Sequence, residues 1–347
     1  MISKAVKYFH SRHSALIFLI TCALSSPLHS DPAYQKRLII IDSQTGAPYQ
    51  TVRESMLAEL TKKGYTKENG FISEYYSLSH YHGAAKSLWQ HRMTKIHYDA
   101  IFLNGTLAVS SFKDIAWQNP QYNFIYASVT DPLGLGLVDT YDNPPTGNFT
   151  GIAFHVPVDI RMDFVKKLIP GVKNIGFVYA DMPQSHSYRQ WIENLQKTPE
   201  WQGVNFHFRK VGFIPSDGGH HRMAQIAKKH IKELDPIVDV FLSPNDQMGA
   251  QSPFAKNVSE IATKPLIGLG HDDVSLGWGA TASIYPDEIA IGVQAANMIE
   301  RIFLGEKISQ IHPVRPASYG IVVDKTKAET FGIKLSTEFM SEAEIVE

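Results

Sequence analysis

Two short polar strings in the second half of the chain carry residue types that could do chemistry. The string GHDD at 270–273 places His271 beside two acids, a group that could bind a metal ion or take part in acid–base catalysis. The string SPNDQ at 243–247 contains Asp246, whose carboxylate could stabilise the start of the following helix or pair with a ligand ammonium. Both interpretations of Asp246 are open at this point.

Two strings in the first half are suited to holding an anion with backbone groups. In NGT at 104–106, glycine permits close approach of the chain, and Thr106 can cap a helix whose first N–H groups face an anion. An ordinary helix cap explains the same residues equally well. In TDPLGLG at 130–136, an Asp-Pro turn and two glycines favour exposed backbone. Neither string is a phosphate loop, because the chain lacks GxxxxGK followed by Ser or Thr.

The sequence does not support an enzyme. It contains neither HExxH nor GxSxG, and no second histidine stands at a metal-ligand spacing from His271. The adjacent side chains of His220 and His221 would diverge on a helix, so a solvated helix start explains them better than a metal site. We therefore expect no catalytic residue, no metal and no cofactor.

All four strings follow or end predicted strands, and these strands alternate with predicted helices. Apolar, β-branched runs such as RLIIID at 37–42 are separated by segments with the spacing of amphipathic helices, which predicts parallel sheets covered on both faces. Ligands of such sheets bind beyond the carboxyl ends of the strands. The predicted strands are 37–42, 71–78, 98–103, 123–129 and 148–154 in a first set, and 174–179, 204–211, 238–242, 265–269 and 281–285 in a second.

Length and composition suit a folded chain of two domains. The 347 residues are 44% apolar and 19% charged, which excludes a disordered or fibrous chain. A single core rarely grows beyond about 250–300 residues, and a segment rich in Pro, Gly, Asn and Thr at 142–151 separates the two sets of strands. With 33 basic and 34 acidic residues, nothing indicates binding to nucleic acid or to anionic lipid.

The first thirty residues have the layout of a cleavable secretory signal. A basic start without acids precedes an apolar stretch at 14–24, which is shorter than the roughly 20 residues that span a bilayer. We expect cleavage after Ser30 and a soluble, exported mature protein. The only cysteine, Cys22, lies in this segment, so the mature chain has no disulfide. Acylation of Cys22 is the less favoured alternative, since the residues before it lack the small side chain that a lipoprotein signal needs.

In these strings the chain resembles the substrate-binding proteins of a bacterial ABC-transporter family. The studied members of that family bind aromatic amino acids. The resemblance covers about residues 36–335, and its most specific part is the combination of Thr-Asp-Pro at 130–132 with GNFTG at 147–151. The stretch at 180–187 departs from the family, which commonly has an Asn-Ser pair there, so the usual ligand does not transfer by resemblance alone. The other matching segments are 104–106, 128–138, 168–172, 243–246, 279–283, 292–296 and 304–306.

The resemblance implies a type I periplasmic binding protein, an α/β fold of two Rossmann-like lobes with parallel sheets joined by a hinge. After a signal peptide at 1–30, the N-terminal lobe would comprise 31–152 plus 284–312, and the C-terminal lobe 153–283 plus 313–347. The chain would then cross between the lobes three times, and the long helix predicted at 287–304 would return to the first lobe.

The implied function is that of the periplasmic solute-binding component of an ABC importer. Such a protein carries a small amino-acid-like solute, aromatic in the studied members, to a membrane permease and its ATPase, and we expect it to be a monomer. One alternative is a sensory protein of the same fold that presents its ligand-bound form to a receptor kinase. A periplasmic hydrolase that uses His271 and Asp272 is the least favoured.

The expected ligand-binding residues stand at the strand ends of both lobes. By the resemblance, the turn at Thr106 and the loop at Thr130 hold the ligand from one lobe, and the loops at Ser185 and Asp246 close from the other. Because these residues stand at predicted strand ends of opposite lobes, we expect Asp246 to anchor the ligand's ammonium group and Thr106 with Thr130 to hold its anionic end. The full set is Ser43, Gly105, Thr106, Thr130, Asp131, Ser185, Asn245, Asp246, His271 and Asp272.

Overall fold

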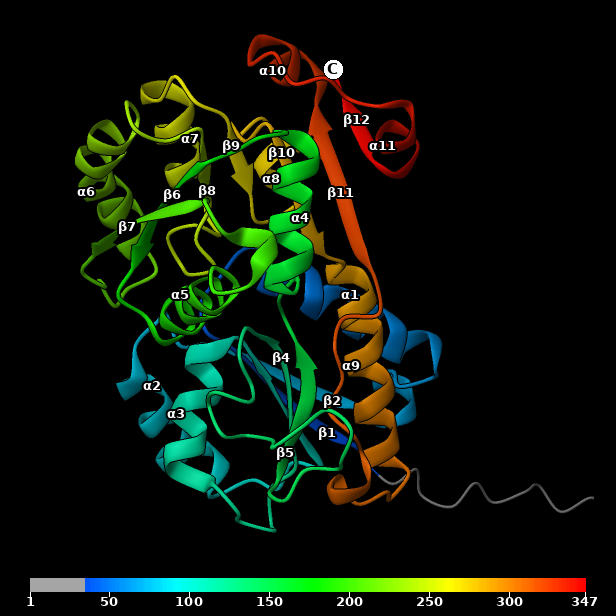
Figure 1. Cartoon of the computed structure of the whole chain (residues 1–347). Helices are drawn as coiled ribbons and strands as arrows, with labels where there is room; N and C mark the ends of the chain where they lie inside the picture. Colours follow the sequence, from blue (N-terminus) through cyan, green and yellow to red (C-terminus); the bar gives the residue numbers. More distant parts are fainter. Residues whose placement is uncertain (1–34) are drawn as a thin grey trace, which may run out of the picture. The chain divides into compact units, whose positions relative to one another are not determined.

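The computed structural model describes residues 35–347, in which strands and helices alternate along most of the chain (Figure 1). The predicted signal peptide, its cleavage site and Cys22 lie outside the described residues. Among the residues described, no helix is both long and apolar enough to cross a membrane.

The first sheet has five strands in the order β2-β1-β3-β4-β5, and every neighbouring pair is parallel. Its inner strands are buried on both faces, whereas the edge strand β2 is partly exposed; alternate side chains of β1 enter two different cores. Leu38 and Ile40 pack with α1 and α9, whereas Ile39 and Ile41 pack with α3. The strands are β1 (Arg37–Asp42), β2 (Ile72–Ser77), β3 (Ala100–Asn104), β4 (Phe124–Val129) and β5 (Phe149–Ala153).

The second sheet has seven strands in the order β12-β11-β10-β9-β8-β6-β7. All of its pairs are parallel except β10 with β11, which run antiparallel. The expected α/β fold of two lobes with mainly parallel sheets is confirmed. Strands β11 and β12 extend the second sheet beyond the predicted set. The strands are β6 (Asn174–Ala180), β7 (Asn205–Val211), β8 (Val240–Leu242), β9 (Leu266–Gly268), β10 (Ala282–Pro286), β11 (Tyr319–Asp324) and β12 (Glu344–Val346).

Helices cover both faces of each sheet. Around the first sheet are α1 (Tyr49–Lys62), α2 (His82–Leu88), α3 (Thr106–Ala116) and α9 (Glu288–Phe303). With the second sheet are α4 (Val158–Leu168), α5 (Pro183–Leu195), α6 (Gly219–Leu234), α7 (Ser252–Ile261), α8 (Asp272–Ser275), α10 (Lys325–Thr330) and α11 (Thr337–Glu342). Single turns occur at Lys67–Asn69, Trp89–Met93, Pro199–Trp201 and Ile308–Gln310.

Helix α9 follows strand β10 of the second sheet but packs against α1 and the first sheet, where Figure 1 shows it in orange. The two helices approach closely at Gly292, where an added Cβ would lie 2.6 Å from the carbonyl oxygen of Val52. Only a residue without a side chain permits this spacing. The exact bounds of the two lobes stay a prediction.

Candidate functional site

Two small adjoining cavities lie beyond the carboxyl ends of strands from both sheets, the place where open parallel sheets bind ligands. Cavity A has a volume of about 30 Å³ and is lined by Ala47, Pro48, Phe154, Ala250, Leu269, Gly270, His271, Asp272, Asp273, Trp278 and Glu288. Cavity B has a volume of about 10 Å³ and is lined by Phe154, His155, Val156, Arg161, Tyr188, Asn245, Leu269, Ile284 and Pro286. Phe154 and Leu269 line both cavities, so the two adjoin and together make the candidate site.

The lobes touch beside these cavities. Gln247 Nε2 donates a hydrogen bond to Gln44 Oε1 at 3.0 Å and another to the carbonyl oxygen of Ser216 at 2.8 Å. Gln251 Nε2 donates to the carbonyl oxygen of Ala47 at 2.7 Å. A cavity needs roughly 10–15 Å³ to hold one water, so a solute of amino-acid size can enter only if the lobes part.

Three of the expected residues in the first lobe shape its loops. Ser43 Oγ accepts a hydrogen bond from the backbone N–H of Ala108 at 3.0 Å, inside the first turn of α3. Gly105 has φ 108°, and an added Cβ would lie 2.4 Å from Ser43 Oγ, so this turn requires glycine. Thr106 Oγ1 accepts from the N–H of Thr130 at 3.4 Å. These contacts tie the ends of β1, β3 and β4 together.

Asp131 completes that group of loop residues. Its Oδ1 accepts a hydrogen bond from the N–H of Gly134 at 2.8 Å, which closes the Asp-Pro turn. None of the five expected residues of the first lobe is among those that line cavities A and B. Their part in ligand binding stays a prediction.

The carboxylate of Asp246 is fully engaged within its own lobe. Oδ2 accepts hydrogen bonds from the N–H of Ala180 at 2.7 Å and from Ser185 Oγ at 2.8 Å, and Oδ1 accepts from the N–H groups of Met248 and Gly249 at 2.9 and 3.0 Å. A carboxylate offers about four acceptor positions, and four donors fill them. Burial raises the pKa of Asp246, and these hydrogen bonds oppose that rise. The geometry favours a loop-stabilising role for Asp246 and Ser185 over the expected ammonium anchor.

His271 and Asp272 line cavity A, but the histidine ring already has partners. Its Nε2 lies 3.1 Å from Glu344 Oε2, and its Nδ1 lies 2.9 Å from Ser275 Oγ. Asp273 Oδ2 accepts hydrogen bonds from the backbone N–H groups of the preceding loop, and burial raises the pKa of Asp273 to about 6. In the described part of the chain, no three His, Cys, Asp or Glu side chains are arranged to hold a metal.

Glu288, at the start of α9, also lines cavity A and was not singled out in the sequence. Burial raises the pKa of Glu288 to about 8; a hydrogen bond with Thr51 opposes the rise, and the nearby Asp272 and Asp273 add to it. Cavity A therefore has an acidic lining, with Glu288 from the helix that packs on the first sheet and Asp272 and Asp273 from the second lobe.

Arg161 and Asn245 line cavity B. Asn245 was expected at the site, whereas Arg161 was missed. The side chain of Arg161 is 1% exposed, and its Nη2 donates to the carbonyl oxygens of Ser243 and Gly268 at 2.9 Å each. The sequence contains a signal that could have identified Arg161, because this charged residue stands at helical spacing from Val158 on the apolar face of α4.

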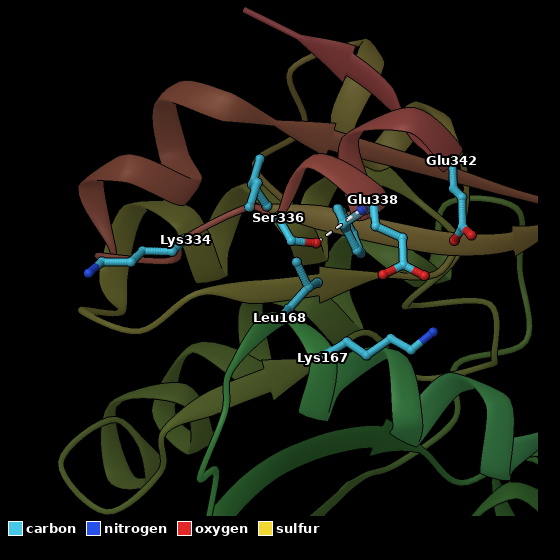
Figure 2. A pocket seen from close by; sticks show the side chains of 8 residues that line it. Lys167, Leu168, Lys334, Ser336, Glu338 and Glu342 are labelled. Carbon is cyan, nitrogen blue, oxygen red and sulfur yellow. Dashed lines mark hydrogen bonds between the residues drawn. The ribbon is translucent and has the colours of Figure 1, made fainter.

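A larger groove, of about 210 Å³, lies elsewhere on the second lobe (Figure 2). It runs between Lys167 and Leu168 at the end of α4 and Glu338 on α11, where the Ser336 side chain accepts a hydrogen bond from the N–H of Phe339 at 3.1 Å. Its charged rim is exposed, and it lies at the C-terminal end of α4, away from the strand ends. Size alone therefore does not identify the site.

Known proteins resemble this chain in sequence and in fold. The family model described as "ABC transporter substrate binding protein" matches residues 52–347. A curated relative, the "Tyrosine-binding protein" of Clostridioides difficile (strain R20291), is 25% identical over 188 residues, which span 54% of this chain and 50% of the relative. The match thus covers about half the length of that relative.

Two solved structures are similar in fold. One is an ABC domain from Streptococcus pneumonia in complex with L-Trp, with a TM-score of 0.75, 19% identity, and coverage of 90% of this chain and 100% of that one. The other is a conserved domain protein from Vibrio cholerae O1 biovar El Tor, with a TM-score of 0.76 and the same identity and coverage. The architecture is that of type I periplasmic binding proteins.

Proposed function

The chain belongs to the ABC transporter substrate-binding protein family, and from that premise we propose that it binds an amino-acid-like solute between its two lobes. The family is a class of solute-binding, non-enzymatic proteins that serve membrane transporters. We further propose that the protein is exported to the periplasm by its N-terminal signal, acts as a monomer, and delivers its solute to the permease and ATPase of an importer.

The observation that carries the proposal is that one of the two adjoining cavities is lined by carboxyl groups and the other by a buried arginine. Cavity A is lined by Asp272 and Glu288, and cavity B by the buried Arg161. A zwitterion that spans the shared wall at Phe154 and Leu269 would meet a complementary group at each end. A neutral sugar would leave the buried guanidinium of Arg161 without a counter-ion, which favours an amino acid over a sugar.

The apolar wall between the charges suits a solute with an apolar or aromatic side chain. Phe154, Leu269 and Trp278 supply this surface. The names of the similar proteins point the same way, since one is a tyrosine-binding protein and another was solved with L-Trp. Aromatic amino acids are therefore the first solutes to test.

Binding would act by shifting the population of lobe arrangements. A solute that contacts both lobes favours the arrangement in which they are close, in proportion to its extra contacts there. The hydrogen bonds from Gln247 to Gln44 and from Gln251 to Ala47 join residues of the two lobes and would help to hold them close.

Thermal unfolding of the purified chain against the twenty amino acids tests the proposal, with hexoses and polyols as the comparison class. A solute present at 100 times its dissociation constant should stabilise the protein by about 2.7 kcal/mol. Stabilisation by one or more amino acids is the expected result. Stabilisation by a sugar but by no amino acid would contradict the proposed solute class and leave the family assignment intact.

A further inference from the structure

The second lobe contains a buried cation without a counter-ion. Arg161 is first among the largest fully buried side chains, at 1% exposure. Over residues 35–347, none of the ion pairs within 4.0 Å involves Arg161. Asp273 lies near enough for the guanidinium to lower its pKa against the effect of burial, but it forms no ion pair with Arg161. Burying a charge is costly unless an opposite charge or hydrogen bonds compensate for it.

Hydrogen bonds hold the guanidinium of Arg161 in place but engage only two of its three nitrogen atoms. Nη2 is engaged by the carbonyl oxygens of Ser243 and Gly268, and Nη1 lies 3.3 Å from the hydroxyl oxygen of Tyr188. Arg161 Nε is buried and has no partner among the described residues. A fixed cation with a spare N–H, on the wall of a cavity, is suited to bind an anion.

The neighbouring polar groups of cavity B are neutral. Asn245 is 5% exposed and offers an amide N–H₂. Burial lowers the pKa of His155, although its hydrogen bond to the backbone of Thr130 and the charge of Asp131 oppose this, and its Nδ1 has no partner within the described chain. No carboxylate lines this cavity, so an incoming anion would meet donors and no like charge.

We propose that Arg161 is the anion receptor of the cleft, and that its Nε, together with Asn245, binds the carboxylate of the solute. This proposal rests on the proposed function, because it requires a solute between the lobes. It places the solute's carboxylate in the second lobe, whereas the expectation from the sequence placed it at Thr106 and Thr130 in the first. The amine would then point into cavity A, toward Asp272 and Glu288.

The test compares three variants with the wild type by calorimetry, using L-tryptophan, L-tyrosine and whichever other amino acid stabilises the wild type most. Arg161→Met keeps an unbranched apolar stem and removes the charge, and Arg161→Lys keeps the charge and removes the planar fork. Arg222→Met is the matched control, because Arg222 is an exposed arginine on α6. We expect Arg161→Met to weaken binding at least about tenfold, Arg161→Lys to weaken it less, and Arg222→Met to leave it unchanged.

Arg161 also holds two backbone carbonyl groups, so circular dichroism first checks that each variant is folded. If neither variant folds, the wild type is titrated with L-tryptophan and with its carboxamide, and the ¹H–¹⁵N resonance of a buried arginine Nε–H is followed. A carboxamide that binds as tightly as the acid, or an Arg161→Met variant with wild-type affinity, would overturn the proposal. A wild type that responds to no amino acid would overturn the proposed function as well.

Discussion

The side chains of Gln44 and Gln247 join the two lobes by a hydrogen bond of 3.0 Å between Nε2 of Gln247 and Oε1 of Gln44. Both residues are almost completely buried, at 1% and 2% exposure. Gln44 follows strand β1 of the first sheet, and Gln247 follows β8 of the second. This pair can exist only when the lobes are close, so it links the closed arrangement to two identified side chains.

Replacing Gln247 by alanine should therefore weaken solute binding without touching the charged cavities. One hydrogen bond makes a net contribution of about 0.5–1.5 kcal/mol, so its removal corresponds to a loss of affinity of up to about tenfold. Calorimetry measures the affinity, and small-angle scattering reports a more open average shape. Gln202→Ala, at an exposed site, is the control. Unchanged affinity in Gln247→Ala would show that the pair does not stabilise the closed form.

Asp246→Ala should reduce stability in the absence of any solute. The substitution leaves the N–H groups of Ala180, Met248 and Gly249 and the Ser185 hydroxyl without their acceptor. Each unsatisfied buried group costs roughly 1–3 kcal/mol, so we expect a loss of at least about 2 kcal/mol in the free energy of unfolding. Urea unfolding followed by circular dichroism measures it. A variant with wild-type stability and greatly weakened binding would restore Asp246 as the ligand's ammonium anchor.

Glu288 should make stability fall as the pH rises from 6 to 8. Burial raises its pKa in the folded state to about 8, above the ordinary value of 4.5, so in this range the folded state holds a proton that the unfolded state has lost. The free energy of unfolding then decreases with pH, by at most about 1.4 kcal/mol per pH unit for one proton. Asp42, with a pKa raised by burial to about 7, adds to the same trend.

The contribution of Glu288 is isolated by comparing Glu288→Gln with wild type in thermal unfolding across that pH range. We expect a flatter pH profile in Glu288→Gln, and an unaltered one in Glu260→Gln, which changes an exposed acid on α7. Identical profiles for wild type and Glu288→Gln would mean that the carboxyl group is already ionised at pH 6.

Gly292→Ala should destabilise the packing of α9 on α1. The new methyl group would lie 2.6 Å from the Val52 carbonyl oxygen and 2.6 Å from Ser55 Cβ, so the helices must separate. Overpacking of this kind typically costs about 1–3 kcal/mol. Gly218→Ala is the matched control, since nothing lies within 4 Å of a Cβ added there. Equal thermal stability of the two variants would show that α9 adjusts without cost.

The order of apolar runs was enough to predict the architecture, because a strand that is buried on both faces has to be apolar throughout. The run RLIIID became β1, and the predicted strands at 98–103 and 123–129 became β3 and β4 within two residues at each end. Strands β11 and β12 were missed, because β11 at Tyr319–Asp324 is half-buried near the sheet edge and β12 is only three residues long. Such short, partly exposed segments carry little periodic signal.

The sequence by itself also placed the loops at 243–247 and 270–273 at strand ends, where residues of both line a cavity, since the carboxyl ends of parallel strands meet at one edge. It could not decide which residues in those loops face a cavity. Asp246 takes its donors from Ala180 and Ser185, more than sixty residues earlier, and Arg161 holds carbonyl groups at Ser243 and Gly268. Whether a polar side chain holds a loop or remains free for a solute depends on partners that are distant in sequence, and only the tertiary structure brings those partners into contact.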